Sequence, residues 1–560
     1  MRKHLRELLT QAIEKAAKGG GLNSSELPPL LLEPPKQREF GDLSSNVAML
    51  WAKSAKKPPR AIAETILKNI EDPDGILARM EIAGPGFLNF TFAAKFYYAQ
   101  LRALARGEYG RLDLGHGERV QVEFASVNPT GPLHVGHGRV AVIGDVLARL
   151  HEATGFDVER EYYVNDAGNQ MENLGLSILA RYRESFGEKV DFPEGGYPGD
   201  YIMEIAAEVR QKQGDQFLAE PKEAAVMFFR EYGGDSLLDT IRAQLRDFGI
   251  EFDSFFSEKA MRERGEVERA MDELRTRGLL YSQDGAEWYS STQFGDDKDR
   301  AVVKSDGELT YFAADIAYHR NKFERHFQKL INVWGADHHG YVPRLKAAMQ
   351  GLGYDPNVLQ IVLVQMVQLT RGGEPVRMGK RTGEFVALEE VLAEVGRDAA
   401  RFFFLMRKSD SHLDFDLDLA KKQSSENPVF YVQYAHARVA SIFEQATKSG
   451  VQLGDRHAIP VDRLELAEEL ELIRAMIQFN DVLEESVREL EPHRLVFYLL
   501  DLAGQFHRYY NRTRVISEDS DLSRARLLLI ENVQKTVGRG LEILGVDAPM
   551  KMAARPETDS

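Results

Sequence analysis

The chain has 560 residues and is too long for a single hydrophobic core, since such cores stop growing at roughly 250 to 300 residues. Its 43% hydrophobic and 28% charged residues are typical of a globular protein, and no apolar run approaches the roughly 18 residues of a membrane span. The lack of cysteine excludes disulfides and thiolate metal sites, and the net charge of −16 argues against indiscriminate binding to nucleic acid.

The first region, residues 1–105, is predicted to be a small α+β domain. Its opening segment carries Glu7 and Glu14 and lacks the apolar stretch of a secretory signal, so we expect a helix of the mature protein and a cytoplasmic location. A proline-rich break follows at 28–35, and a strand pair is expected near 82–92.

A nucleotide-binding fold is predicted to begin near residue 118, within a second region at 106–420. Val120, Val122 and Phe124 alternate with polar residues as in a strand, and a turn follows at 128–132. Apolar residues then recur at helical spacing over 140–150, which would press this helix onto a sheet. A strand, a turn and a helix in this order are typical of the opening of a Rossmann-like domain.

Further strands are expected at 157–164, 330–334 and 358–369, separated by segments long enough for the crossovers of a parallel sheet. The long charged stretch at 170–295 is interpreted as an insertion with crossover helices. From 421 to 560 the sequence is almost wholly helical, and this predicts a separate helical bundle whose main helices are expected at 464–490, 495–514 and 524–544.

The segment His134-Val135-Gly136-His137 stands where the turn passes into the helix. Two imidazoles three positions apart face the same side of the helix N-terminus, where free backbone N–H groups and the helix dipole attract phosphate. Gly136 would let an adenine ring or a phosphate approach the backbone, and the histidines could donate hydrogen bonds to phosphate oxygens. Taken alone, the pattern also fits histidines that have no catalytic role.

A basic loop with two glycines, VRMGKRTG at 376–383, follows the last predicted strand. Lys380 is a compact cation that could follow a departing pyrophosphate, and the glycines permit the loop to close. Together with the histidine segment, this loop resembles the paired HIGH and KMSKS signatures of class I aminoacyl-tRNA synthetases. Gly379 stands where the signature serine would be, so Lys380 must carry more of the phosphate contact.

Six segments resemble the arginyl-tRNA synthetases, namely EFASVNPTGPLHVGH (123–137), YVNDAGNQ (163–170), KSDGELTYFAADIAYH (304–319), WGADHHGY (334–341), NPVFYVQYAHAR (427–438) and FHRYYNRTRV (506–515). The likeness runs from Gly41 nearly to Met552. It implies a Rossmann-like α/β catalytic domain at 106–420. An N-terminal α+β domain that contacts tRNA would precede it at 1–105, and an all-α anticodon-binding domain would follow at 421–560. The implied activity is the ATP-dependent attachment of arginine to tRNA.

The resemblance places the substrate arginine beside Tyr311 and Asp315. A guanidinium requires a planar, bidentate carboxylate partner, and these two residues, four positions apart on one helix face, offer an aromatic ring and such a carboxylate. Without the family, Asp315 would equally fit an ordinary exposed helix residue. The other arginine-binding candidates are Ser126, Asn128 and His137 for the backbone groups of the substrate, and Glu123 or Asp337 for its ammonium.

The resemblance also implies ATP as a substrate, Mg²⁺ carried on its phosphates, no zinc, and a monomer that binds tRNA(Arg). Catalysis is assigned to His134, His137 and Lys380. The ATP-binding candidates are His134, Gly136, His137, Met378 and Lys380. The first signature region comprises Asn128, Pro129, Thr130, Gly131, Pro132, Leu133, His134, Val135, Gly136 and His137. Tyr431, Tyr434 and His436 are candidates for stacking on anticodon bases.

A second interpretation is a zinc-dependent hydrolase, in which Asp337, His338 and His339 join the two histidines of the first signature as metal ligands. The sequence contains no H-E-x-x-H segment, and a metal site would leave the Lys380 loop and the helical C-terminal region without a role. A binding protein that kept the synthetase fold is a third interpretation. It is disfavoured because both signature regions retain reactive side chains.

Overall fold

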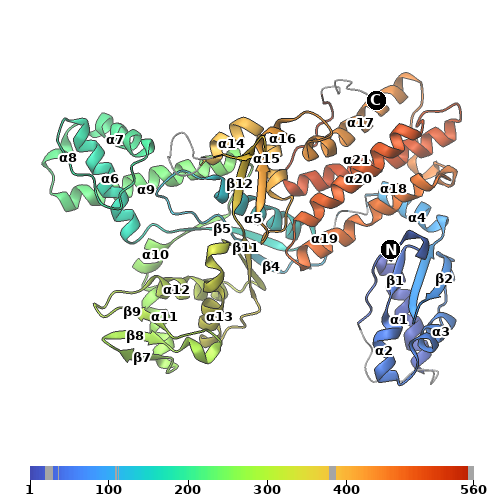
Figure 1. Ribbon diagram of the computed structural model, residues 1–560, viewed down its shortest axis with the longest axis horizontal. Coiled ribbons are helices and arrows are strands. Elements are labelled where there is room, and N and C mark those ends of the chain that lie inside the picture. The colour runs from blue at the N-terminus through green and yellow to red at the C-terminus, as the bar shows by residue number, and fades with distance from the viewer. Residues whose placement is uncertain (19–28, 36, 108–109, 111, 377–385, 553–560) are drawn as a thin grey trace.

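The computed structural model describes residues 1–18, 29–35, 37–107, 110, 112–376 and 386–552. Figure 1 shows an N-terminal unit in blue, a central α/β unit, and a helical bundle in orange and red. The N-terminal unit lies against the helical bundle. The central unit carries two projections on the side opposite the N-terminal unit.

The N-terminal unit packs helices against a three-stranded antiparallel sheet of order β1-β3-β2. Its elements are α1 (Arg2–Lys18), β1 (Leu43–Ser45), α2 (Val47–Ala55), α3 (Pro59–Lys68), β2 (Leu77–Ala83), β3 (Phe87–Phe92) and α4 (Ala94–Ala105). The strands β2 and β3 form the antiparallel pair expected near 82–92. The last helix of the unit, α4, packs on the helical bundle.

Five parallel strands form the central sheet, in the order β11-β10-β4-β5-β6. They are β4 (Arg119–Glu123), β5 (Asp157–Val164), β6 (Ser254–Ser257), β10 (Lys329–Gly335) and β11 (Leu359–Val364). Numbered by appearance in the chain, this is the doubly wound arrangement, and the winding reverses between β4 and β10. The predicted Rossmann-like fold is confirmed. In such sheets, ligands bind beyond the carboxyl ends of the strands at the point of reversal.

Two helices cover opposite faces of this sheet beside β4. A Cβ at Gly144 of α5 (Val135–Ala153) would collide with the ring of Phe124, so this helix packs closely on one face. Lys322 of α12 (Tyr311–Glu324) bonds to Glu123, the residue before Phe124. Because successive residues of an extended chain point to opposite faces, α5 and α12 enclose the sheet from two sides.

The stretch 170–295 is only partly an insertion. Its first helices, α6 (Asn169–Ser185), α7 (Asp200–Gln213) and α9 (Lys222–Asp247), form one of the two projections in Figure 1. The chain then returns to the central sheet as β6. This strand was not predicted, because its four residues, Ser-Phe-Phe-Ser, show no alternation of polar and apolar side chains. The second projection contains α10 (Glu258–Glu263), α11 (Glu266–Thr276) and the sheet of β7 (Leu280–Gln283), β8 (Ala286–Tyr289) and β9 (Arg300–Val303).

The strand expected at 358–369 divides into two. Its first part is β11 of the central sheet, whereas its second part, β12 (Val367–Arg371), pairs with β14 (Leu413–Asp416) in a separate small sheet. The helix expected at 464–490 is likewise two helices that meet at Gln478. The bundle consists of α17 (Pro428–Lys448), α18 (Ala467–Ile477), α19 (Phe479–Arg488), α20 (His493–Arg512) and α21 (Ser520–Leu544).

Arg401, on α15 (Arg397–Phe404), joins the helical bundle to the central unit. Its guanidinium is fully buried, donates to the carbonyls of Leu544 and Phe248 at 3.0 Å each, and pairs with Asp145 of α5. A Cβ at Gly545 would overlap this guanidinium, so the end of α21 needs glycine there. The end of the bundle is therefore fixed to the helix that follows the first signature.

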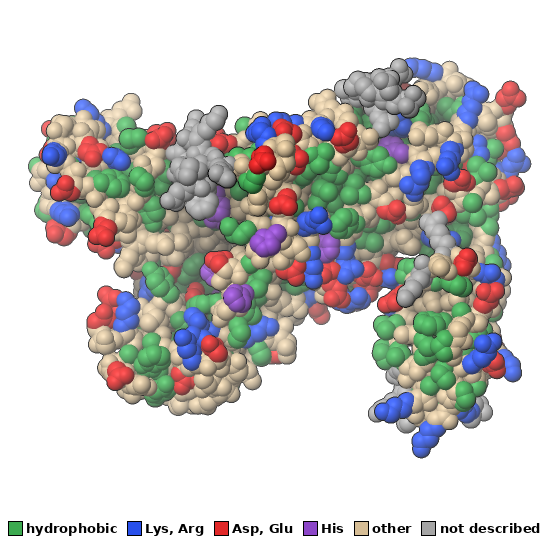
Figure 2. All heavy atoms as spheres, viewed as in Figure 1, with side chains coloured by type: hydrophobic (Ala, Val, Ile, Leu, Met, Phe, Trp, Pro, Cys, Tyr) green, Lys and Arg blue, Asp and Glu red, His purple; other side chains and the backbone are tan. Residues whose placement is uncertain are grey.

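Figure 2 shows acidic and basic side chains interspersed over the face it draws, with histidines gathered near its middle. This distribution agrees with the expectation that the acidic chain does not attract nucleic acid indiscriminately. No helix in the described part of the chain is long and apolar enough to cross a membrane.

Candidate active site

His134 caps the N-terminus of α5 with its own side chain. Its Nδ1 accepts hydrogen bonds from the backbone N–H groups of Gly136 at 3.1 Å and His137 at 3.3 Å. In return, Nδ1 of His137 accepts from the His134 N–H at 3.3 Å, and the two rings stack with their centroids 3.4 Å apart. The expectation of free backbone N–H groups at this helix end was wrong for Gly136 and His137, because both N–H groups donate to the imidazole of His134.

This arrangement fixes the proton of each ring. Since both Nδ1 atoms accept, each neutral imidazole carries its proton on Nε2. Burial lowers the pKa of His134, and burial together with the charge of His134 lowers the pKa of His137 to about 3. Both rings are therefore neutral donors near pH 7. An anion at this helix end would therefore meet imidazole N–H groups rather than the backbone N–H groups of Gly136 and His137.

The structure gives a steric reason for glycine at position 136. A Cβ at this position would lie 3.0 Å from Cε1 and 3.2 Å from Nδ1 of the His134 ring. Such contacts are tighter than ordinary van der Waals packing, so the glycine makes room for the ring that caps the helix. The signature spacing is thus explained by the capping geometry itself.

The carboxyl end of β4 bends sharply. Ala125 has a φ of +65°, in the left-handed region that few residues other than glycine adopt. After this bend, Oγ of Ser126 donates to Oε1 of Glu123 at 2.7 Å and accepts from the Tyr163 N–H at 3.1 Å. The amide of Asn128 donates to Oε1 of Gln170 at 2.5 Å. Glu123, Ser126 and Asn128 therefore gather at one strand end, as predicted.

Asp315 lies on α12 one turn after Tyr311, as their spacing predicted. The hydroxyl of Tyr341, which follows β10, donates to Oδ2 of Asp315. Burial and the charges of Glu258 and Glu123 raise the pKa of Asp315 to about 7, against the opposing effect of the Tyr341 hydrogen bond. Asp315 is thus a partly buried, hydrogen-bonded carboxyl group rather than an exposed helix residue. The Tyr311 side chain is 59% exposed.

A second carboxylate, Glu258, lies within electrostatic range of Asp315, and it was not among the predicted site residues. Glu258 begins α10 directly after β6 and is only 2% exposed. Its Oε2 accepts from the Tyr163 hydroxyl at 2.9 Å, and its Oε1 accepts from Nε of Arg262 at 2.8 Å. The one sequence signal for it, an acidic residue at the carboxyl end of a strand, depended on recognising β6.

Asp337 is not drawn into this group. It lies in the turn Ala336–Tyr341 after β10, where its side chain is 81% exposed and forms an ion pair with His338 at 3.5 Å. In the described part of the chain, no three His, Cys, Asp or Glu side chains are grouped so that they could hold a metal ion.

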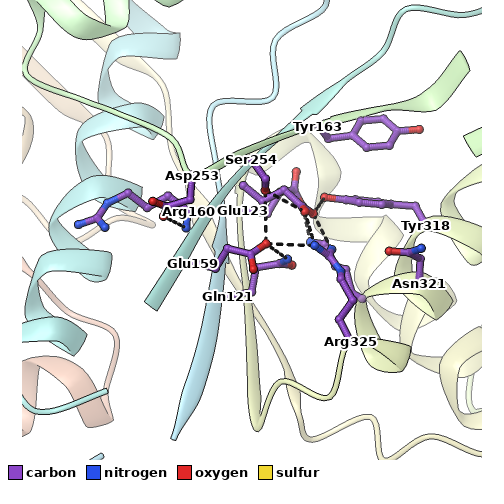
Figure 3. Close-up of polar contacts among 12 residues, drawn as sticks. Gln121, Glu123, Glu159, Arg160, Tyr163, Asp253, Ser254, Tyr318, Asn321 and Arg325 are labelled. Carbon is purple, nitrogen blue, oxygen red and sulfur yellow. Dashed lines mark hydrogen bonds and ion pairs between the residues drawn. The ribbon is translucent and has the colours of Figure 1, made fainter. Parts of the chain in front are cut away.

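Ion pairs and hydrogen bonds around the buried Glu161 hold the C-terminal end of α12 on the sheet, beyond the candidate pocket (Figure 3). Arg325 donates to Glu161 at 2.6 and 3.0 Å and to Glu159 at 3.1 Å. The hydroxyl of Tyr318 donates to the same Glu161 at 2.6 Å, and Ser254 of β6 adds a hydrogen bond at 3.2 Å. These contacts hold α12 against β5 and β6, and so they fix the position of Asp315 relative to the sheet.

Lys380 and Met378 lie outside the described residues. The chain is described again from Val386, whose carbonyl accepts from the Val135 N–H at 3.1 Å, and the Leu388 N–H donates to the carbonyl of Leu133 at 2.8 Å. The residues that follow the second signature are therefore hydrogen-bonded directly to the first.

Three family models match successive parts of the chain. They describe the arginyl-tRNA synthetase N-terminal domain at 3–92, the class I (R) tRNA synthetase catalytic domain at 101–413 and the DALR anticodon-binding domain at 432–552. The arginine–tRNA ligases of Citrifermentans bemidjiense and Syntrophotalea carbinolica are each 50% identical to this chain. The matches cover 99% of this chain and 100% of each relative. The chain belongs to the arginyl-tRNA synthetase family.

The fold agrees with solved structures of arginyl-tRNA synthetases. The Thermus thermophilus enzyme superposes with a TM-score of 0.79 at 23% identity, and the match covers 99% of this chain and 100% of that one. As an arginyl-tRNA synthetase, the protein activates arginine with ATP, releases pyrophosphate and transfers arginine to the 3′ end of tRNA. The predicted family, activity and substrates are confirmed, and the zinc-hydrolase and binding-only interpretations are excluded.

The three tRNA candidates of the arginyl-tRNA synthetase bundle differ in exposure. His436 is 8% exposed, and its Nδ1 lies 3.0 Å from the Pro549 carbonyl, so it is part of the packing of the bundle. Tyr431 and Tyr434 are partly exposed and lie beside the ring of His507, at centroid distances of 4.6 and 5.9 Å. Arg438 stacks over Tyr434 at 4.5 Å.

Proposed function

We propose that the guanidinium of arginine binds between Asp315 and Glu258. The observation that supports this most strongly is a partly buried Asp315 carboxyl group, held by the Tyr341 hydroxyl, whose pKa is raised first by burial and then by the charges of Glu258 and Glu123. A bound guanidinium would offset the repulsion between these carboxyl groups, and it offers a planar set of N–H donors. The hydroxyl of Tyr341 orients Asp315, and the ring of Tyr311 would cover the substrate side chain.

The opposite end of the substrate would lie at the carboxyl end of β4. Each oxygen of Glu123 accepts one hydrogen bond within the protein, which leaves a second lone pair on each for the ammonium of arginine. Ser126, Asn128 and His137 would contact the backbone groups of the substrate. Asp337, the other candidate for the ammonium, is 81% exposed, so we assign the ammonium to Glu123.

ATP would bind at the N-terminus of α5. The carboxylate of arginine attacks the α-phosphorus of ATP, and pyrophosphate leaves. His134 and His137 would donate from Nε2 to phosphate oxygens as negative charge builds, without any change in their own protonation. Gly136 keeps the His134 ring seated on the helix. In the sequence, Lys380 stands six residues before Val386, which is hydrogen-bonded to the first signature. Lys380 and Met378 would contact the phosphates and the nucleotide from that side.

Magnesium is expected to enter on the ATP phosphates rather than at a preformed protein site. This fits the described residues, which offer no group of three potential ligands, and it fits the preference of Mg²⁺ for substrate phosphates and water. When bound, the ion would neutralise phosphate charge.

We also propose three domains, with bounds at 1–105, 106–420 and 421–560. The first would contact tRNA and the last would bind its anticodon, where the partly exposed Tyr431 and Tyr434 could stack on unpaired bases and His436 would support them. The enzyme would act as a monomer in the cytoplasm, where tRNA and ATP are available.

The first test is pyrophosphate exchange with each amino acid, with and without tRNA(Arg). We expect exchange with arginine alone among the amino acids, and only when tRNA is present, because arginyl-tRNA synthetases generally need bound tRNA before they activate arginine. The amino-acid selectivity follows from the partly buried Asp315 carboxyl group, since a neutral side chain in the same place would offer it no compensating charge. Brisk exchange without tRNA would contradict the coupling to tRNA, and exchange with another amino acid would contradict the assigned pocket.

A further inference from the structure

Behind the proposed arginine pocket, a chain of hydrogen bonds links its two ends. It begins at Glu123, whose Oε2 accepts from Nζ of Lys322 at 3.0 Å. Nζ of Lys322 also donates to Oδ1 of Asn332 at 2.8 Å and lies 4.6 Å from the centroid of the Tyr318 ring. These three contacts match the three N–H donors of the ammonium, so a fully buried cation is satisfied on all sides.

From Asn332 the chain continues to Asp315. Nδ2 of Asn332 lies 2.7 Å from Nε2 of His319, and Nδ1 of His319 lies 2.8 Å from the backbone carbonyl of Asp315. Because a carbonyl oxygen can only accept, the His319 ring carries its proton on Nδ1 and accepts the Asn332 amide at Nε2. Donation therefore runs outward from Lys322, to Glu123 on one side and through Asn332 and His319 to Asp315 on the other.

The fold explains why these side chains meet. Glu123 and Asn332 are paired residues on β4 and β10, the two strands between which the winding reverses. Asp315, His319 and Lys322 are spaced four and three positions apart, so they share one face of α12. Lys322, His319 and Asn332 are each at most 2% exposed, and their bonds run from the sheet to the helix.

Stability alone does not account for this chain. Replacing a buried ion pair with well-packed apolar residues is often neutral or stabilising, so an apolar face would hold α12 on the sheet equally well. A polar chain differs from apolar packing in being directional, because each hydrogen bond fixes a distance and an angle. Such a chain between the ammonium end and the guanidinium end would fix the length of the pocket.

We propose that Lys322, Asn332 and His319 are positioning residues that hold Asp315 at a set distance from Glu123 and so match the pocket to the length of arginine. This proposal rests on the proposed arginine site, and it extends that site to residues that do not touch the substrate. The pocket would discriminate arginine from homoarginine, which carries the same guanidinium on a side chain one methylene longer.

The test is Asn332→Leu, which keeps the side-chain shape and breaks the chain in its middle. Leaving buried partners unsatisfied costs about 1 to 3 kcal/mol, so the half-saturating arginine concentration in pyrophosphate exchange should rise roughly 5- to 150-fold. The response to ATP should not change. The half-saturating concentration of homoarginine should rise by a smaller factor, so the preference for arginine over homoarginine should decrease. His319→Gln is the second variant, and it should show the same selective loss.

Arg320→Met is the matched control. Arg320 also lies on α12, but it forms its ion pairs with Glu273 and Glu324 on the other side of the helix. Losing it should destabilise the helix without changing the preference between the two substrates. The positioning role would be overturned if Asn332→Leu and His319→Gln folded and, like Arg320→Met, kept the wild-type preference for arginine over homoarginine. An unaltered arginine response in Asp315→Asn would overturn the proposed arginine site instead.

Discussion

Asp315→Asn should raise the half-saturating arginine concentration by roughly 30- to 5000-fold. The substitution keeps the shape of the side chain and the hydrogen bond from Tyr341, but it removes the charge and one arm of the bidentate pair. Losing one side of a buried, hydrogen-bonded charge pair costs about 2 to 5 kcal/mol, which converts to this range. The response to ATP should stay as in wild type. Separate titrations of arginine and ATP on the folded variant measure both.

The same residue predicts a pH dependence. The pKa of Asp315 lies at about 7 in the free enzyme, and only the ionised carboxylate attracts a guanidinium. The half-saturating arginine concentration should therefore fall as the pH rises from about 6 to about 8, because the carboxyl group loses its proton over this range. In Asp315→Asn this dependence should disappear, since no group titrates there.

Asp337→Asn provides the control for both measurements. Asp337 is an acidic residue of the same sheet edge, but it is mostly exposed and pairs only weakly with His338. Its substitution should leave the arginine response and its pH dependence close to wild type. An unaltered arginine response in Asp315→Asn would contradict the assignment of Asp315 as the guanidinium partner. Glu258 and Glu123 would then be the candidates for that role.

The parts of the site that the sequence predicted are those set by local spacing. Val120, Val122 and Phe124 alternate as one strand must, and Tyr311 and Asp315 share a helix face because they are four positions apart. Such patterns are determined by the periods of strand and helix, so they can be read without knowing the fold.

The parts that the sequence did not predict depend on contacts between distant segments. Glu258 reaches the pocket because β6 joins the edge of the central sheet, and four residues without alternation gave no sign of that pairing. Asn332 becomes a neighbour of Glu123 through strand pairing over more than two hundred positions. The capping role of His134 was hidden because the side-chain acceptor expected at such a position is Ser, Thr, Asp or Asn.

The double role of His134 allows its capping function to be separated from its chemistry, and His134→Asn is the variant that does so. Asparagine is among the best helix N-caps and can accept the N–H groups that Nδ1 of His134 now holds. It cannot present a donor where Nε2 of the imidazole stands. Loss of one transition-state donor costs about 2.7 to 4 kcal/mol, so single-turnover formation of the adenylate should slow roughly 100- to 1000-fold. The thermal unfolding midpoint should not change.

His134→Ala is the companion variant, since it removes the cap and the donor together. It should show the same kinetic loss and, in addition, a loss of about 0.5 to 2 kcal/mol in the free energy of unfolding. If His134→Asn formed the adenylate at the wild-type rate while His134→Ala did not, the imidazole would serve only to cap α5. Phosphate stabilisation would then fall to His137, whose Nε2 is the neighbouring donor.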